Sequence, residues 1–372
     1  MKKFLAILLT LAMLFSVASF AAADEGMKVA MITDYGDITD QSFNQTTYEA
    51  CKAFCEEKGL DFQYFRPGSD SDTDRISAIE NAIEEGFNVI VMPGYAFAPA
   101  IVAVVEEYPE VTFVALDVSE YDLQAAKGTE ADFSWVYPAN LYSAVYQEEL
   151  CGYMAGYAAV KLGYKKLGFL GGMAVPAVVR YGYGFVQGAD AAAAELGLTD
   201  VEIKYVYGNQ FYGDADITAY MDTWYANGTE VVFACGGGIF SSAAEAATKE
   251  GINGKVIGVD VDQAPTIDGK YGEGLTVTSA MKGLAPTVAA ELSSILDGTF
   301  EGGKVENLGL VGEDPDANFV QIAGSTQFAD GFTADDYKAL VAKMFAGEIT
   351  VSPDTENAPA TTINVDYQGN IK

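Results

Sequence analysis

The chain has 372 residues, half of them hydrophobic, with 21 basic against 53 acidic side chains and a net charge of −32. That charge disfavours contact with nucleic acid and anionic membranes, and the apolar content argues against disorder. Histidine is absent, which removes the commonest general base, the commonest zinc ligand and the Ser-His and Cys-His dyads. Since the length exceeds what one hydrophobic core usually supports, we expect two lobes.

The first 23 residues have the parts of a secretory signal peptide. Lys2 and Lys3 precede an apolar run from Phe4 to Phe15, and small residues follow up to position 23. This pattern is too short and wrongly flanked for a membrane anchor. We therefore expect residues 1–23 to be removed on export. No cysteine lies near the predicted mature start at Asp24, so we expect a periplasmic or extracellular protein without a lipid anchor.

From residue 28 onward, short apolar runs alternate with amphipathic stretches. Strands are predicted at 29–33, 60–65, 87–92 and 111–117, and helices at 45–59, 74–86 and 98–109. The strands read as unbroken apolar runs, which is typical of a parallel sheet that is covered on both faces. Residues 24–143 therefore predict the first part of a doubly wound α/β lobe.

The same alternation restarts near residue 144. Strands are predicted at 166–172, 201–208, 230–237, 255–260 and 275–283, and helices at 146–163, 183–197, 214–228, 241–251 and 284–298. We assign residues 144–281 to the main part of a second lobe. Residues 282–315 are expected to return to the first lobe, and residues 316–372 to form the rest of the second lobe and a C-terminal segment. A helix over 334–349 and a final strand are expected in that last segment.

Two α/β lobes in one exported chain suggest a hinged molecule with a cleft between the lobes. Ligands of open α/β sheets bind beyond the carboxyl ends of the strands. The residues at those ends are Asp34, Asp117, the glycines 236–238, Asp260, Met281 and Lys282. A single aspartate after a strand is more often a helix cap or a turn residue. Three of them in one cleft favour a ligand with hydroxyl or ring N–H donors.

Three other features favour structural roles. The glycines at 236–238 lack the Walker spacing, so close backbone approach is a better interpretation than phosphate binding. The acidic segment 69–77 has Arg75 and Asn81 where a calcium loop needs glycine and glutamate, so it favours a helix cap. The four cysteines are better interpreted as small buried residues than as a disulfide framework, because the spacing of Cys51 and Cys55 on a helix is unsuitable for a disulfide bond.

Seven segments carry a family resemblance. The motifs TDYGDITDQSFNQ, DRISAIENAIEEGFNVIV, VTFVALD, ELCGYMAGYAA, RYGYGFVQG, GVDVDQ and TSAMKG occur in this order. The chain resembles the Bmp family over about residues 28–350, the basic-membrane-protein or PnrA-like nucleoside receptors of ABC importers. The resemblance implies a type I periplasmic-binding-protein fold, in which two Rossmann-like lobes are joined by three crossovers.

The resemblance also implies roles for individual residues. Asp34 and Asn44 would bond the purine edge, and Phe43 would stack on its face. Asp117, Asp260 and Lys282 would hold the ribose hydroxyls. Phe211 or Tyr212 would close on the other face of the base, with Tyr207 as a competitor. Gly237 joins the expected ligand-binding residues from its place after a strand.

Two residues of the first motif depart from the family pattern. The loop commonly reads DxGGxxDKSFNQ, and here Asp37 replaces the second glycine and Gln41 the lysine. Both changes make the entrance of the cleft more acidic. The identity of the ligand is therefore the part of the resemblance that these departures affect most.

The leading hypothesis is a monomeric binding protein without cofactor or metal, which delivers a nucleoside, a purine in particular, to an ABC permease and its ATPase. A receptor for a monosaccharide or another small polar solute is the alternative on the same fold. A nucleoside hydrolase could use Asp34, Asp37 and Asp40, but no nucleophile-base pair supports it. An extracellular adhesin or sensor subunit also stays open.

Overall fold

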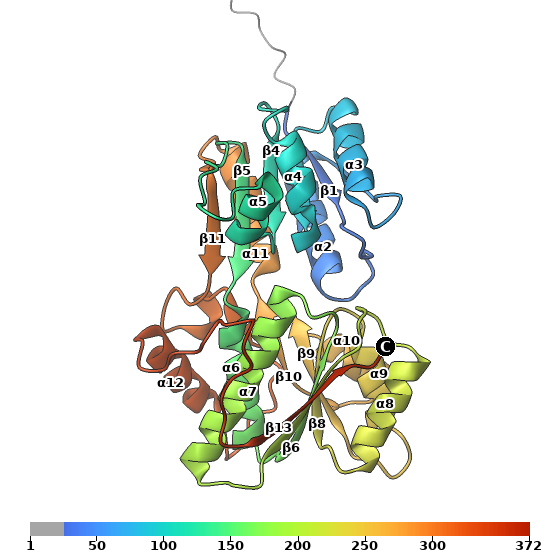
Figure 1. The fold of residues 1–372 in the computed structure, drawn as a ribbon, viewed down its shortest axis with the longest axis vertical. Coiled ribbons are helices and arrows are strands. Elements are labelled where there is room, and N and C mark those ends of the chain that lie inside the picture. The colour runs from blue at the N-terminus through green and yellow to red at the C-terminus, as the bar shows by residue number, and fades with distance from the viewer. Residues whose placement is uncertain (1–25) are drawn as a thin grey trace, which may run out of the picture.

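The protein consists of two α/β lobes, one above the other (Figure 1). The structure is a computed structural model that describes residues 26–372, so the predicted signal peptide lies outside the described residues. Within 26–372, no helix combines the length and the apolar character needed to cross a membrane.

The first lobe is built on a six-stranded parallel sheet in the order β11-β5-β4-β3-β1-β2. Its strands are β1 (Lys28–Ile32), β2 (Asp61–Phe65), β3 (Val89–Pro93), β4 (Thr112–Leu116), β5 (Leu141–Tyr146) and β11 (Lys304–Leu308). Its helices are α2 (Phe43–Lys58), α3 (Asp72–Glu84), α4 (Ala98–Val104), α5 (Glu120–Lys127) and α11 (Leu284–Leu296). Helix α2 packs against α11, and α4 packs against both α3 and α5.

The second lobe has a seven-stranded sheet in the order β12-β10-β9-β8-β6-β7-β13, and β12 is antiparallel to its neighbour β10. Its strands are β6 (Lys166–Gly171), β7 (Glu202–Tyr207), β8 (Val231–Cys235), β9 (Lys255–Asp260), β10 (Thr276–Lys282), β12 (Val320–Ile322) and β13 (Asn364–Asn370). Its helices are α6 (Glu148–Lys161), α7 (Pro176–Leu196), α8 (Ala215–Ala226), α9 (Phe240–Ala247), α10 (Ala264–Tyr271) and α12 (Ala334–Phe345).

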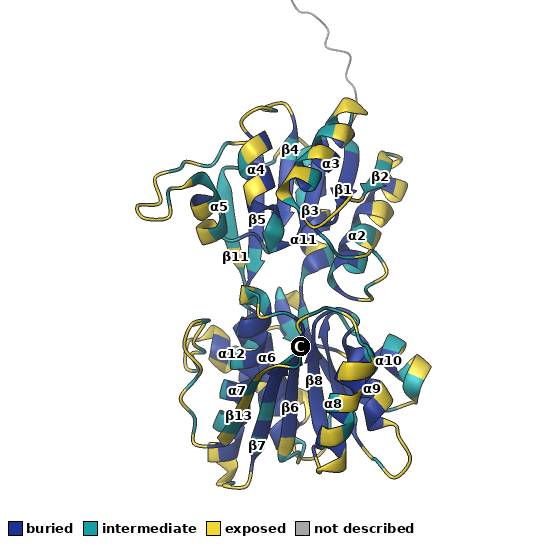
Figure 2. Cartoon of the chain, turned by 45° about the vertical axis from the view of Figure 1, so that its right-hand side comes forward, coloured by how far each residue is buried: buried dark blue, intermediate teal, exposed yellow. Residues whose placement is uncertain are grey.

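Strand periodicity explains how one sheet supports two cores. Along β1, Val29 and Met31 join the core that also contains residues of α2, whereas Ala30 and Ile32 join the core under α3 and α4. Successive side chains of a strand point to opposite faces, so a strand covered on both sides must be apolar throughout. The central strands of both sheets are accordingly buried, while edge strands such as β11 and the outer helix faces are more exposed (Figure 2).

Helices α6 and α7 run side by side at unusually close range (Figure 1). A methyl group at Gly152 or Gly156 would lie 2.2 or 2.1 Å from a backbone oxygen of α7. Gly184 and Gly188 face α6 in the same way. Glycine is required at these four positions because any side chain would push the two helix backbones apart.

Three crossovers join the lobes. The chain passes from β5 to α6 through Gln147, from β10 to α11 through Gly283, and from β11 to β12. The crossovers lie together, since the amide of Gln147 donates to Leu308 O at 2.9 Å and that of Gly283 to Phe319 O at 2.7 Å. This is the hinge of a type I periplasmic-binding-protein fold, as predicted.

Several elements differ from the sequence prediction. The helix expected from residue 146 begins at Glu148, because Tyr146 ends β5. Strands β5, β11 and β12 and helices α5 and α10 were not predicted; β11 in particular carries only half-buried and exposed residues. Ser71 caps α3 by accepting from the amide of Asp74 at 3.2 Å, so the helix-cap interpretation of this acidic segment is confirmed. All four cysteines are buried and free, as expected.

Candidate functional site

A cavity of about 650 Å³ lies between the lobes, at the carboxyl ends of β1, β4, β8, β9 and β10. Its position is the one that open α/β sheets favour for ligands. All nine residues predicted to bind the ligand line this cavity: Asp34, Phe43, Asn44, Asp117, Phe211, Tyr212, Gly237, Asp260 and Lys282.

The loop after β1 fixes the carboxylate of Asp34. Its Oδ1 accepts hydrogen bonds from the amides of Tyr35 at 2.6 Å and Gly36 at 2.9 Å. Burial raises the pKa of Asp34, while these amides oppose the rise. Gly94 has φ +129, and a methyl group there would lie 2.3 Å from Asp34 Oδ2. The backbone at Gly94 therefore leaves the space that the carboxylate occupies.

Asp40 organises the start of α2. Ser42 stands at the N-cap position, but its side chain makes no capping bond. The carboxylate of Asp40 instead accepts from the amides of Ser42, Asn44 and Gln45 at 2.9–3.0 Å, and from Asn44 Nδ2 at 3.0 Å. Asn44 is 7% exposed, and its Oδ1 has no donor among the described residues. The helix start thus presents an unused acceptor at the cavity wall.

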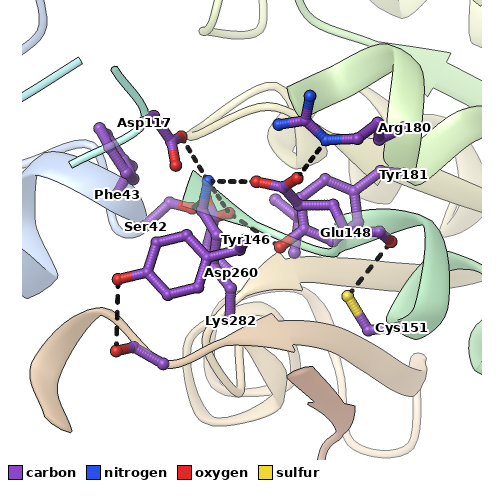
Figure 3. A network of polar contacts seen from close by, with 12 residues as sticks. Ser42, Phe43, Asp117, Tyr146, Glu148, Cys151, Arg180, Tyr181, Asp260 and Lys282 are labelled. Atoms are coloured by element: carbon purple, nitrogen blue, oxygen red, sulfur yellow. Dashed lines mark hydrogen bonds and ion pairs between the residues drawn. The ribbon is translucent and has the colours of Figure 1, made fainter. Parts of the chain in front are cut away.

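A buried ionic cluster surrounds Lys282 (Figure 3). Lys282 Nζ lies 2.5 Å from Asp117 Oδ2, 3.3 Å from Glu148 Oε1 and 3.9 Å from Asp260 Oδ1. Arg180 Nε donates to Glu148 Oε2 at 2.7 Å. The ammonium group is also 4.7 Å from the centroid of the Phe43 ring, a cation–π distance.

The charged groups of this cluster shift one another's pKa values. Burial raises the pKa of Asp117 to about 6, more than Lys282 lowers it. Burial disfavours the charged form of Lys282, but Asp117, Glu148 and Asp260 outweigh it and raise the pKa of the lysine. For Glu148, burial is likewise outweighed, here by Arg180 and Lys282, so its pKa is lowered. Asp117 Oδ1 has no donor within residues 26–372 and remains available to a ligand.

Two of these aspartates have strained backbones. Asp117 has φ 61 and Asp260 has φ 64, in the left-handed region that few residues other than glycine adopt. Such conformations persist where the surroundings hold them, and they concentrate at ligand sites. Here both lie at the carboxyl end of a strand and turn the aspartate into the cavity.

The three aromatic candidates of the second lobe differ in their position relative to the cavity. Phe211 is half-buried and stacks on Tyr35 of the first lobe, with ring centroids 6.4 Å apart. Tyr212 lines the cavity but is 63% exposed. Tyr207 does not line it and bonds the hydroxyl of Tyr205 at 2.9 Å. Gly237, with φ +52, follows β8 and packs against the backbone of Phe211.

Direct contacts hold the two lobes together across the cavity. Ser42 Oγ donates to Asp260 Oδ2 at 2.5 Å, and Gln263 Nε2 donates to Gln41 O at 3.0 Å. The ion pair of Asp117 with Lys282 spans the same gap. The structure is therefore that of the closed protein.

Sequence reasoning missed several groups at this site. Glu148 and Arg180 complete the ionic cluster from α6 and α7, and Tyr35 reaches across the cleft. The strand-end rule does not find α7 residues, because they are not at strand ends. Glu148 follows β5 by two residues, so a correct prediction of β5 would have revealed it.

Comparison with known proteins places the chain in a family. The family model Bmp, "ABC transporter substrate-binding protein PnrA-like", matches residues 27–314. The "ABC transporter nucleoside-binding protein BmpA" of Lactococcus lactis is 26% identical over 76% of this chain and 79% of its own length. Basic membrane protein B of Borreliella burgdorferi is 28% identical over 80% of this chain and 82% of its own.

Solved structures agree with the fold. An ABC transporter solute-binding protein from Aeropyrum pernix superposes with a TM-score of 0.66 at 20% identity, covering 89% of this chain and 88% of that one. One from Conexibacter woesei gives 0.65 at 22% identity, covering 88% and 99%. As a protein of this kind, the chain binds a small-molecule ligand outside the cytoplasm and works with permease and ATPase components. The chain belongs to the Bmp family of PnrA-like ABC transporter substrate-binding proteins.

Proposed function

We propose that the protein binds a purine nucleoside between its lobes and delivers it to the permease. One observation supports this best: a single cavity places an aromatic ring, Phe43, beside two different sets of polar groups. One set is Asp34 with Asn44; the other is Asp117 with Asp260 and Lys282. A base needs the ring and the first set, and a ribose needs the second. The printed name of the Lactococcus lactis relative, a nucleoside-binding protein, agrees.

The ribose end would use the carboxyl oxygens of Asp117 and Asp260 as hydrogen-bond acceptors. Asp117 Oδ1 has no donor among residues 26–372, and Asp260 accepts from Ser42 Oγ at 2.5 Å and from the Tyr181 hydroxyl at 3.2 Å. Ionised carboxylates accept hydrogen bonds from vicinal hydroxyls, and charge-assisted bonds are about twice as strong as neutral ones. A ligand that contacts both lobes stabilises the closed state, which is how binding would be coupled to hinge motion.

A calorimetric panel tests the proposal. The protein is first unfolded and refolded to remove any ligand that co-purifies, and is then titrated with purine nucleosides, pyrimidine nucleosides, free purines, ribose and hexoses. We expect purine nucleosides to bind most tightly. Binding of sugars alone would contradict the proposal and favour a monosaccharide receptor. Chromatography of the recovered ligand should show intact nucleoside, and release of the free base would identify a hydrolase instead.

Replacement of Phe43 by alanine tests whether the ligand base stacks on this ring. A base stacked on an aromatic ring gains about 1–3 kcal/mol, so Phe43→Ala should weaken nucleoside binding by about tenfold or more. Binding of a sugar that uses only the carboxylates should change less. Phe54→Ala, on the core side of the same helix, serves as a control for loss of packing.

A further inference from the structure

The C-terminal segment reaches the side of the second lobe that faces the cleft (Figure 1). After α12, residues 346–363 run along α7, where the amide of Ser352 donates to Gln187 Oε1 at 2.9 Å. Strand β13 then pairs with β7 in parallel, so both strands have their carboxyl ends at the cavity edge of the sheet. Beyond β13, the amide of Ile371 donates to Tyr207 O at 2.8 Å. The last residues of the sequence therefore lie beside the loop that follows β7.

That loop, residues 209–214, forms part of the cavity wall. Four of its residues line the cavity: Asn209, Gln210, Phe211 and Tyr212. The glycines after β8 hold one side of the loop, since the amide of Gly238 donates to Phe211 O at 2.9 Å. A methyl group at Gly236 would lie 3.0 Å from Phe211 Cδ1, so the ring lies close against the glycine backbone. The position of Phe211 then depends on how the rest of the loop is held.

The other side of the loop is held by Lys372. Its Nζ donates to Gln210 Oε1 at 3.0 Å and pairs with the carboxylate of Asp214. Gln210 Nε2 in turn donates to Tyr212 O at 2.8 Å and to Asp214 Oδ2 at 2.9 Å. One network of hydrogen bonds thus joins the residue before Phe211 to the residues after it, and Lys372 connects this network to the C-terminal segment.

Resting on the proposed function, we infer that Lys372 is a positioning residue for ligand binding, which holds the loop 209–214 so that Phe211 covers the base of the nucleoside. Lys372 does not line the cavity and acts through the loop. Because the side chains of Lys372 and Asp214 are 36% and 28% exposed, their ion pair adds little to global stability. A loop that is already ordered before binding, however, lowers the entropy cost of closing on a ligand.

Replacement of Lys372 tests the inference. We expect Lys372→Met to weaken binding of a purine nucleoside by about threefold in calorimetry, mainly through faster dissociation, with the urea unfolding transition unchanged. Lys372→Arg keeps a cation with several donors and should restore most of the affinity. Lys338→Met is the matched control: it removes the same charge from an exposed position on α12, away from the cavity, and should bind like the wild type.

A double-mutant cycle with Phe211→Ala shows whether Lys372 acts through Phe211. Phe211→Ala alone should weaken nucleoside binding by about fivefold or more, and adding Lys372→Met should then change it no further. If Phe211→Ala binds too weakly to measure, Phe211→Leu takes its place in the cycle. An unchanged affinity in Lys372→Met, or the same threefold loss with and without Phe211, would refute the positioning role and leave the proposed function intact. Absence of nucleoside binding by the wild type would overturn both.

Discussion

Replacing Glu149 with glutamine should make the protein more stable at pH 8 by about 3 kcal/mol, and should change its stability much less at pH 5. Glu149 is the second residue of α6 and is only 5% exposed. Its Oε2 has no hydrogen-bond partner among residues 26–372. Burial raises the pKa of this carboxyl from its usual 4.5 to about 7, with a smaller contribution from the neighbouring Glu148.

The sign of this change in stability follows from proton linkage. A carboxyl with a raised pKa binds more protons folded than unfolded, so its ionisation destabilises the protein as pH rises from 4.5 to about 7. Each pKa unit corresponds to about 1.4 kcal/mol, which gives about 3 kcal/mol above pH 7 and about 1 kcal/mol at pH 5. Glutamine resembles the protonated carboxyl in shape and removes this cost.

Urea unfolding at both pH values measures the difference. Trp224 is buried in the second lobe and reports on it alone once Trp135, the other tryptophan, is replaced by phenylalanine. Glu148→Gln, one residue away, is the matched control: it weakens the buried contacts to Arg180 and Lys282 and should destabilise by about 3 kcal/mol. A Glu149→Gln variant no more stable than its parent at pH 8, or equally shifted at both pH values, would refute the reasoning.

Three further predictions concern the cavity. Gly36→Ala should weaken nucleoside binding by about tenfold in calorimetry, because the new methyl group would lie 2.1 Å from Asn44 Nδ2. Lys282→Met should abolish binding and lower the free energy of unfolding in urea by about 3 kcal/mol, because it leaves buried carboxylates unpaired. If the ligand bonds ionised Asp117, whose pKa is about 6, affinity should rise about tenfold from pH 5 to pH 7, and Asp117→Asn should remove this dependence.

The fold could be predicted because its signals are local. The unbroken apolar runs at β1, β3 and β8 are buried along their whole length, as strands covered on both faces must be. β11 gave no signal: KVENL at the sheet edge buries no residue fully, and its place beside β5 depends on the return of the chain through α11. Strand order and edge strands are set by tertiary packing, which periodicity does not report.

The site could be predicted in part for a related reason. The strand-end rule reached Asp34, Asp117, Asp260 and Lys282, which share one cavity. It could not reach Arg180, whose helix approaches through the glycine contacts of α6 and α7. Nor could it distinguish the loop carboxylates: both oxygens of Asp40 accept from the backbone of its own loop, whereas Asp34 Oδ2 has no donor in the part of the chain that the structure describes.

The two departures from the family motif can now be judged by what their atoms contact. Asp37 accepts from the amide and hydroxyl of Thr39 at 2.9 and 2.6 Å, and it pairs with Arg66 at 3.3 Å, where both side chains are at least half exposed. Gln41 has φ 59 and meets the second lobe through its backbone oxygen, not its side chain. The change at 37 is therefore partly neutralised at the rim, and the contact at 41 needs no particular side chain. Neither residue takes part in the hydrogen bonds that hold Asp34 and Asn44, so these two departures should leave recognition of an uncharged nucleoside unchanged. Their effect on rim charge should be confined to charged ligands, whose association rates salt screens.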